Sequence, residues 1–264
     1  VLMKDILDLE RYPLDQEGSP QWQAAVDRAA VEMQTTGMFN LNQLMKPQAL
    51  KKATAEIKPV MDSQSHAHKR RHNIYFQPDF KGLDPKHPAL REVESTNHTL
   101  CADQIVQSTV LAIYEYPPLL RFIAAVMGKP TLHVMEDPLA RANVMSYREG
   151  EALNWHFDRC EFTTTLLLQE PLDGGKFQYR SNLRTAENPN YEGIAAVLDG
   201  RDPDVKTLTL EAGTLNVFRG VNSLHRVTPV QGSKERMIAI FSYYENTGVM
   251  FSDEESIGFY GRAS

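Results

Sequence analysis

The sequence predicts an α+β protein, with a mainly helical section at residues 1–130 and a β-rich core at residues 131–246. Two observations support this prediction. Apolar residues in the first half recur at helical spacing between capping residues, whereas the second half consists of short apolar runs separated by turn residues. Many short runs of this kind favour a sandwich or a barrel. We expect one domain over residues 1–264, with residues 247–264 as a C-terminal tail and candidate lid.

The first long helix is predicted from its start and stop signals. Ser19 can cap the helix, Pro20 is tolerated at its first position, and Gly37 ends it. Apolar residues between these signals share one face: Trp22, Ala25, Val26, Ala29 and Met33. Further helices are predicted at residues 47–61, 100–114 and 118–127.

Strands are predicted from residue 132 onward. They occupy residues 132–135, 142–147, 153–158, 162–168, 176–179, 207–210, 214–218, 223–230 and 236–244. A short helix at residues 191–198 interrupts them. We interpret residues 214–218 and the run that contains His225 as two antiparallel strands joined by a short turn, which would deliver His225 to the mouth of a barrel.

The composition is that of a chain that can fold around a hydrophobic core of its own. With 264 residues, 42% hydrophobic and 23% charged, the chain needs neither a metal nor disulfides merely to fold. Cys101 and Cys160 are too few for a disulfide scaffold and lie in no zinc-ribbon spacing, which favours a reducing cytoplasm.

Charge argues against two classes of partner. The net charge of −6 gives no electrostatic reason to bind duplex nucleic acid or an anionic membrane. Charged residues interrupt residues 1–8, which therefore resemble neither a signal peptide nor a membrane span. We expect a soluble cytoplasmic protein with no nucleic-acid or membrane partner.

Residues 154–159 carry the strongest functional signal. Alternate side chains of a strand face the same way, so His156 and Asp158 can bind one metal, and the distant His225 can complete the set. Two imidazoles and one carboxylate on one face of a metal suit non-haem Fe(II) and its oxygen chemistry. The His-x-Asp pair alone is weak evidence, because such a pair also occurs on surface strand edges.

Two further residues strengthen this interpretation. Arg236 lies on the predicted strand after His225, where its guanidinium can hold a carboxylate through two parallel hydrogen bonds. Tyr147 precedes the His156 strand and would place a phenol near the same pocket.

With these residues in place, the chain over residues 142–244 resembles the iron(II)- and 2-oxoglutarate-dependent dioxygenases. The resemblance implies a double-stranded β-helix core, also called a jelly roll or cupin-like fold, and the cofactors Fe(II), 2-oxoglutarate and O2. It also implies that His156, Asp158 and His225 bind iron. Arg236 would grip the distal carboxylate of 2-oxoglutarate, and Tyr147 would assist.

Two segments, residues 69–76 and 241–245, resemble the carrier-independent amino-acid halogenases and their hydroxylase relatives. A radical halogenase needs a vacant iron position for halide, so a small residue replaces its carboxylate ligand. Asp158 fills that position here, which predicts hydroxylation of a free amino acid or a similar small polar metabolite.

Candidate substrate contacts are suggested by this closer resemblance and by the position of polar residues near the ends of predicted strands. Arg70 and Arg71 can meet the carboxylate of an amino acid, and the resemblance favours Arg71; the run around them can equally be a solvated polar face. Asn143 and Arg159 lie near predicted strand ends, where specificity is usually set, although each can also be a turn or surface residue.

Three alternatives stay open at this point. The same iron chemistry can end in desaturation or ring closure, because both outcomes use the same ligands. A prolyl-hydroxylase-like enzyme would act on a peptide. From a different class, a cupin-like metal-binding or sensing protein would hold zinc or nickel without oxidation, but it would have no need of the carboxylate clamp at Arg236.

Overall fold

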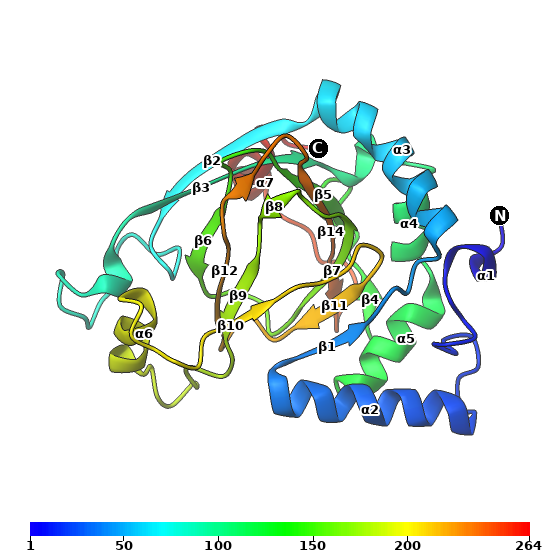
Figure 1. The fold of residues 1–264 in the computed structure, drawn as a ribbon, viewed down its shortest axis with the longest axis horizontal. Helices are drawn as coiled ribbons and strands as arrows, with labels where there is room; N and C mark the ends of the chain where they lie inside the picture. Colours follow the sequence, from blue (N-terminus) through cyan, green and yellow to red (C-terminus); the bar gives the residue numbers. More distant parts are fainter.

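Two antiparallel sheets surround a common interior in the computed structural model, which describes residues 1–264 (Figure 1). The larger sheet has strand order β1-β11-β7-β14-β5-β3-β2, and the smaller has β10-β9-β12-β6. The larger sheet contains β1 (Met38–Leu41), β2 (His66–His72), β3 (Val93–Leu100), β5 (Ala142–Tyr147), β7 (Thr163–Gln169), β11 (Leu215–Phe218) and β14 (Arg236–Phe241). The smaller contains β6 (Leu153–His156), β9 (Phe177–Arg180), β10 (Lys206–Leu208) and β12 (Leu224–Val227). Two short pairs complete the strands, β4 (His133–Val134) with β15 (Tyr243–Tyr244), and β8 (Asp173–Gly174) with β13 (Val230–Gln231).

Most helices gather on one side of the larger sheet (Figure 1). They are α1 (Met3–Ile6), α2 (Pro20–Thr36), α3 (Pro47–Gln64), α4 (Thr109–Tyr114) and α5 (Pro117–Val126). Two short 3-10 turns, η1 (Pro88–Leu90) and η2 (Ala102–Gln104), lie in the connections. Helix α6 (Tyr191–Leu198) lies at the opposite end of the molecule, and α7 (Asp253–Tyr260) packs against β2. Every helix is too short or too polar to cross a lipid bilayer.

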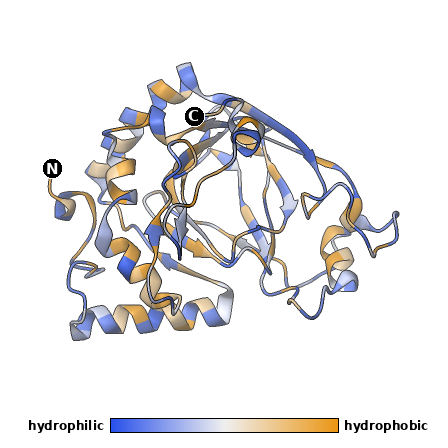
Figure 2. Ribbon diagram, turned by 180° about the vertical axis from the view of Figure 1, so that it is seen from behind, coloured by the Kyte–Doolittle hydropathy of each residue, from blue (hydrophilic) through white to orange (hydrophobic).

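Helix α2 forms as its signals predict. The Ser19 hydroxyl accepts a hydrogen bond from the Trp22 N–H (3.1 Å), and Gly37 ends the helix in the left-handed conformation (φ 78°). All the predicted apolar residues of its inner face are buried, and Trp22 packs edge-on against Phe122 of α5. Figure 2 shows the alternation of polar and apolar residues along these helices that one buried face requires.

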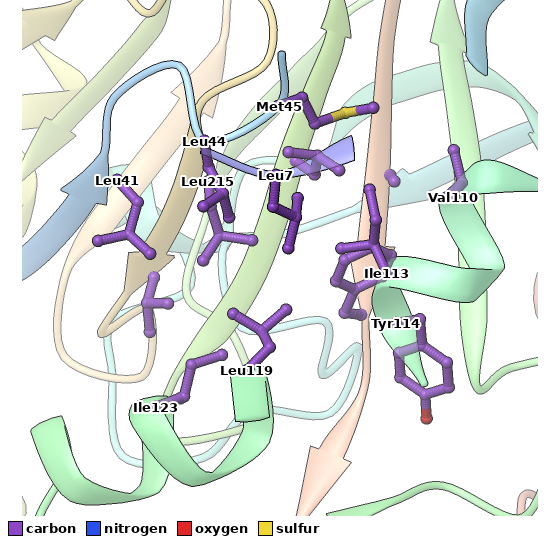
Figure 3. Close-up of a cluster of buried hydrophobic side chains, with 14 of the residues drawn as sticks. Leu7, Leu41, Leu44, Met45, Val110, Ile113, Tyr114, Leu119, Ile123 and Leu215 are labelled. Atoms are coloured by element: carbon purple, nitrogen blue, oxygen red, sulfur yellow. The ribbon is translucent and has the colours of Figure 1, made fainter. Parts of the chain in front are cut away.

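The main hydrophobic core lies between the helices and the larger sheet. It contains 40 buried residues, and Figure 3 shows some of those contributed by the N-terminal segment, α4, α5 and β11. Strand alternation separates this core from the interior between the sheets. On β7, Leu166 and Leu168 pack in the main core, whereas Leu167 packs with Tyr147 and Ile238 in a separate cluster. One face of β7, β14 and β5 is therefore available to line a site.

Three strands lie within the section that we expected to be mainly helical. Strand β1 forms one edge of the larger sheet, and β3 and β2 form the other. The predicted helix at residues 100–114 is in fact the end of β3, the turn η2 and the short helix α4. The inward face of β3 carries buried polar side chains, including Ser95, Asn97 and Thr99, so this strand lacks the alternation of apolar and polar residues that marks a half-buried strand.

The predicted hairpin between residues 214–218 and His225 is wrong. Strand β11 pairs with β1 and β7 in the larger sheet, whereas β12 pairs with β9 and β6 in the smaller sheet. Residues 219–223 therefore cross from one sheet to the other. The hairpin is excluded because β1, which the sequence did not reveal as a strand, occupies the edge beside β11.

Candidate metal centre

Strands β6 and β12 lie side by side and place His156 opposite His225. Both side chains are buried, and their ring centroids are 4.1 Å apart. The regular strand ends at His156, so Asp158 lies in the following loop and not on the strand as predicted. Its Oδ1 atom nevertheless lies 3.2 Å from Nε2 of both histidines. The structure thus brings the three predicted ligands together, with one potential ligand atom of each within 4.8 Å of the others.

Backbone carbonyls fix the orientation of both imidazoles. Nδ1 of His156 lies 2.8 Å from the Asn154 carbonyl, and Nδ1 of His225 lies 2.7 Å from the Ser223 carbonyl. A carbonyl only accepts, so each Nδ1 carries the proton and each Nε2 directs a lone pair toward Asp158. Burial and the nearby His225 lower the pKa of His156, which keeps its ring neutral.

The carboxylate of Asp158 is held by two neighbours. Its Oδ2 atom accepts a hydrogen bond from the Thr163 hydroxyl (3.0 Å), and its backbone N–H donates to the Gly220 carbonyl (3.1 Å). Burial raises the pKa of Asp158, but His225 and His156 hold it well below its usual value whenever a positive charge lies on that side of the carboxylate.

These contacts fit a bound cation. Two imidazole lone pairs and one carboxylate oxygen converge without a proton donor between them, which is unfavourable unless a positive charge lies among them. Two histidines and one carboxylate on one side leave other metal positions open, as the Fe(II) arrangement requires.

Aromatic rings cover the triad. The ring of Phe76 lies 5.5 Å from His156, and the rings of Phe218 and Phe177 lie 4.7 and 5.7 Å from His225. Phe76 adopts a left-handed backbone conformation (φ 53°), which is strained for a bulky residue and common at functional sites. Sequence reasoning gave Phe76 no role of its own, although it ends the 69–76 segment that carries the closer resemblance. It missed Thr163 and Gly220, which belong to no recognisable motif.

Arg236 lies in a cavity next to the triad. Strands β14 and β5 place it opposite Tyr147, with its guanidinium carbon 5.9 Å from the centre of the phenol ring. Arg236 is only 6% exposed, yet its side chain has no ion pair and no hydrogen bond. The cavity has a volume of about 190 Å³ and shares the ring of Phe177 with the surroundings of His225. Burial lowers the pKa of Arg236, but a guanidinium stays protonated.

The two arginines of β2 face opposite ways. Arg71, which the resemblance favoured, points outward, is 69% exposed and pairs with Glu92 (3.1 Å). Arg70 lies on the half-buried face, with its guanidinium carbon 4.5 Å from the centre of the Phe76 ring. The period of two in a strand therefore brings Arg70, and not Arg71, toward the triad.

The other two candidate substrate contacts, Asn143 and Arg159, lie in different surroundings. Asn143 is buried; its amide donates to the carbonyls of Leu100 and Leu139 and accepts from the Tyr260 hydroxyl (2.9 Å). Both ends of this side chain are therefore used to hold the chain together. Arg159 directly follows Asp158, is exposed and forms no ion pair.

Comparisons with known proteins identify the family and the fold of this chain. Residues 21–254 match the family model of Halogenase D (HalD). No curated protein sequence matches the chain. The fold is similar to that of an oxidoreductase of the 2OG-Fe(II) oxygenase family from Burkholderia pseudomallei, with TM-score 0.52, 14% identity and coverage of 89% of this chain and 94% of that chain.

Two further structures show the same likeness. The non-heme alpha-ketoglutarate-dependent epimerase SnoN from nogalamycin biosynthesis has TM-score 0.55 and 14% identity, with 84% and 83% of the two chains covered. HygX from Streptomyces hygroscopicus, solved with nickel and 2-oxoglutarate bound, has TM-score 0.54 and 14% identity, with 82% and 85% covered. These similarities confirm the predicted α+β fold with a jelly-roll core.

Proposed function

Because the chain belongs to the Halogenase D family and has the fold of the 2-oxoglutarate- and Fe(II)-dependent oxygenases, we propose that it is an oxidoreductase that hydroxylates a small molecule. It binds Fe(II) through His156, Asp158 and His225, and it uses 2-oxoglutarate and O2 as co-substrates. The single observation that carries hydroxylation is the carboxylate of Asp158, which lies between the two histidines where a halogenase would keep a place for halide.

When bound, Fe(II) with 2-oxoglutarate and O2 supplies the oxidant for an unactivated C–H bond, and 2-oxoglutarate leaves as succinate and CO2. The protein's own residues prepare the site. The backbone carbonyls of Asn154 and Ser223 hold the imidazoles with Nε2 toward the metal position, and Thr163 fixes one oxygen of the carboxylate.

Arg236 binds the distal carboxylate of 2-oxoglutarate. A buried guanidinium without a partner is costly to the folded protein, and a carboxylate in its cavity would supply the missing counter-charge. Tyr147, which pairs with Arg236 across β5 and β14, packs beside the guanidinium. A protein that only stores or senses a metal has no use for this cation, so Arg236 favours the enzyme.

The substrate in this proposal is a free amino acid or a similar small polar metabolite, with Arg70 as a carboxylate contact. The aromatic rings of Phe76 and Phe218 exclude water from the reacting centre. The tail contributes a wall, because Phe259 of α7 lies against the Arg70 guanidinium, 5.9 Å from its carbon. Both cysteines are free, which supports our proposal of a cytoplasmic location.

The test is an anaerobic titration. Adding Fe(II) and then 2-oxoglutarate should give the weak visible charge-transfer band of a chelated complex, and Asp158→Ala and His225→Ala should each abolish it. His133→Ala, which changes a histidine outside the triad, should keep the band. No band from folded, iron-loaded protein would instead favour a metal-binding protein without oxidation.

Product mass then identifies the outcome. Hydroxylation adds one oxygen atom to the substrate, whereas desaturation or ring closure removes two hydrogen atoms. A product that lacks the added oxygen would overturn hydroxylation in favour of desaturation or ring closure, and the proposed iron site would stand.

A further inference from the structure

The loop after strand β9 holds the crossing segment, residues 219–223, which passes from one sheet to the other. The guanidinium of Arg184 makes the main contact, because its Nε and Nη2 atoms both donate to the Val221 carbonyl (3.1 and 2.9 Å). Two residues earlier in the loop, the Asn182 N–H donates to the Ser223 hydroxyl (3.0 Å). The middle and the end of the crossing segment are therefore both attached to this loop.

The same guanidinium lies over the ring of Phe157, the residue between the predicted ligands His156 and Asp158. Its carbon is 3.7 Å from the centre of the Phe157 ring and 5.7 Å from the centre of the Tyr75 ring. Phe157 is buried in an apolar cluster that is separate from the main core. Arg184 thus touches the ligand-bearing chain on one side and the crossing segment on the other.

The crossing segment supports two of the three predicted ligands. The Gly220 carbonyl accepts a hydrogen bond from the Asp158 N–H (3.1 Å), and the Ser223 carbonyl accepts one from Nδ1 of His225 (2.7 Å). Val221, to which Arg184 donates, lies between these two carbonyls in the sequence. A displacement of Val221 would therefore disturb the support of both ligands, and such supports set metal affinity.

An arginine at this position has a cost that packing alone does not explain. Arg184 is half-buried and forms no ion pair with a carboxylate. Burial lowers the pKa of Arg184, but a guanidinium stays protonated, so a cation lies among apolar side chains. The planar fork compensates by fixing one carbonyl through two donors while its face covers an aromatic ring. Neither an apolar side chain nor a lysine ammonium can make both contacts in this geometry.

We propose that Arg184 is a positioning residue for the metal centre, which holds the crossing segment against Phe157 and through this segment fixes Asp158 and His225. This inference rests on the proposed function and deepens it, because it adds to the proposed iron site a residue that touches neither the metal position nor a substrate.

Arg226 provides a matched comparison. Its guanidinium carbon lies 4.8 Å from the centre of the Trp155 ring, so it covers the aromatic residue on the other flank of His156. Its Nε atom donates to the Gln178 side chain of β9 (2.8 Å) and not to the crossing segment. Arg226 therefore shares the contact between guanidinium and ring with Arg184 but lacks the contact that the proposal requires.

The test compares metal affinity with stability in the two arginine variants. Arg184→Met should weaken Ni(II) binding by roughly tenfold to a hundredfold in a calorimetric titration, and it should change the visible absorption bands of bound Co(II), which report ligand geometry. Arg226→Met should keep the native Ni(II) affinity and the native Co(II) spectrum, even where denaturation shows that it has lost stability.

Arg184→Lys separates positioning from simple stabilisation. Lysine keeps a cation beside Phe157 but has no fork for the Val221 carbonyl, so it should recover most of the stability while the Ni(II) affinity stays low. The same comparison applies if Arg184→Met fails to fold. Native affinity in Arg184→Lys, or equal losses of affinity in Arg184→Met and Arg226→Met, would overturn the positioning role.

The outcomes also separate this inference from the proposed function. If the native protein binds neither Ni(II) nor Fe(II), the proposed iron site fails and the role of Arg184 fails with it. If the native protein binds metal and Arg184→Met binds it equally well, only the role of Arg184 is overturned.

Discussion

Gly220 and Asp158 occupy adjoining space that leaves no room for another side-chain carbon: a Cβ atom at residue 220 would overlap the Oδ2 and Cγ atoms of Asp158. The same two residues are joined by the hydrogen bond from the Asp158 N–H to the Gly220 carbonyl. The segment that crosses between the sheets is therefore shaped around a carboxylate at position 158. A halogenase, with a small residue at that position, would not impose this requirement.

Gly220→Ala should weaken binding of a divalent metal by roughly tenfold to a hundredfold, because the new methyl group must displace a ligand from its supported position. Equilibrium titration with Ni(II) measures the change. Gly258→Ala is the matched control, since a Cβ there meets no atom within 4 Å. In an Asp158→Gly background, Gly220→Ala should cost much less stability than in the native protein, because the conflict has been removed. Additive effects of the two substitutions on unfolding free energy would contradict this coupling.

Local signals predicted much of the secondary structure. Ser19, Pro20 and Gly37 defined α2, and the strand-like runs of the second half each correspond to at least one strand. Helix α6 lies at residues 191–198 as predicted. These elements follow from capping, turn residues and hydrophobic period, which act over a few residues.

The remaining features depend on residues far apart in the sequence. Strand β2 consists almost entirely of polar residues and is recognisable as a strand only from its pairing with β3. Nothing in the sequence indicates that Gly220 faces Asp158. Only the structure shows which face of β2 points inward, and therefore that Arg70 and not Arg71 lies toward the triad. Ligand types could be predicted from the sequence, whereas the residues that support them required the three-dimensional arrangement.

Thr163→Val should lower metal affinity by roughly tenfold while leaving the fold intact. The substitution keeps the shape of the side chain but removes the hydroxyl that donates to Asp158 Oδ2, and partners of metal ligands commonly contribute effects of this size. Metal titration provides the measurement. Thr165→Val, two residues along β7 and without a side-chain hydrogen bond, should bind metal as the native protein does. Equal affinity of the two variants would remove Thr163 from the site.

Thr164→Val should raise the free energy of unfolding by about 1 kcal/mol. The Thr164 hydroxyl is buried in the apolar core without a hydrogen-bond partner, and valine fills the same volume without that polar atom. Ser95→Ala provides the contrast, because the Ser95 hydroxyl contacts His72 and accepts from the Asn154 N–H. Chemical denaturation should show a gain for the first variant and a loss for the second. A loss in both would indicate that Thr164 has a partner in solution.

Asn143→Ala should lower unfolding free energy by roughly 2–3 kcal/mol, because it removes one hydrogen bond each from the Leu100 carbonyl, the Leu139 carbonyl and the Tyr260 hydroxyl. Tyr260→Phe removes only one of these bonds and should cost less. Both are measured by denaturation of the metal-free protein. If Asn143→Ala weakens binding of amino acids without affecting stability, the residue is a substrate contact as the sequence first indicated.

Arg236→Leu should raise the dissociation constant for 2-oxoglutarate by roughly tenfold to a hundredfold, since it removes a charge-assisted bidentate contact. The same substitution should leave the stability of the cofactor-free protein unchanged or higher, because it removes a buried cation that has no partner in the protein. Arg180→Leu should show the reverse pattern, as Arg180 pairs with Asp202 (3.0 Å) and stabilises the fold without lining the cavity. Calorimetry and denaturation of both variants measure the two quantities separately. An Arg236→Leu protein that loses stability but binds 2-oxoglutarate normally would show that this arginine serves the fold and not the co-substrate.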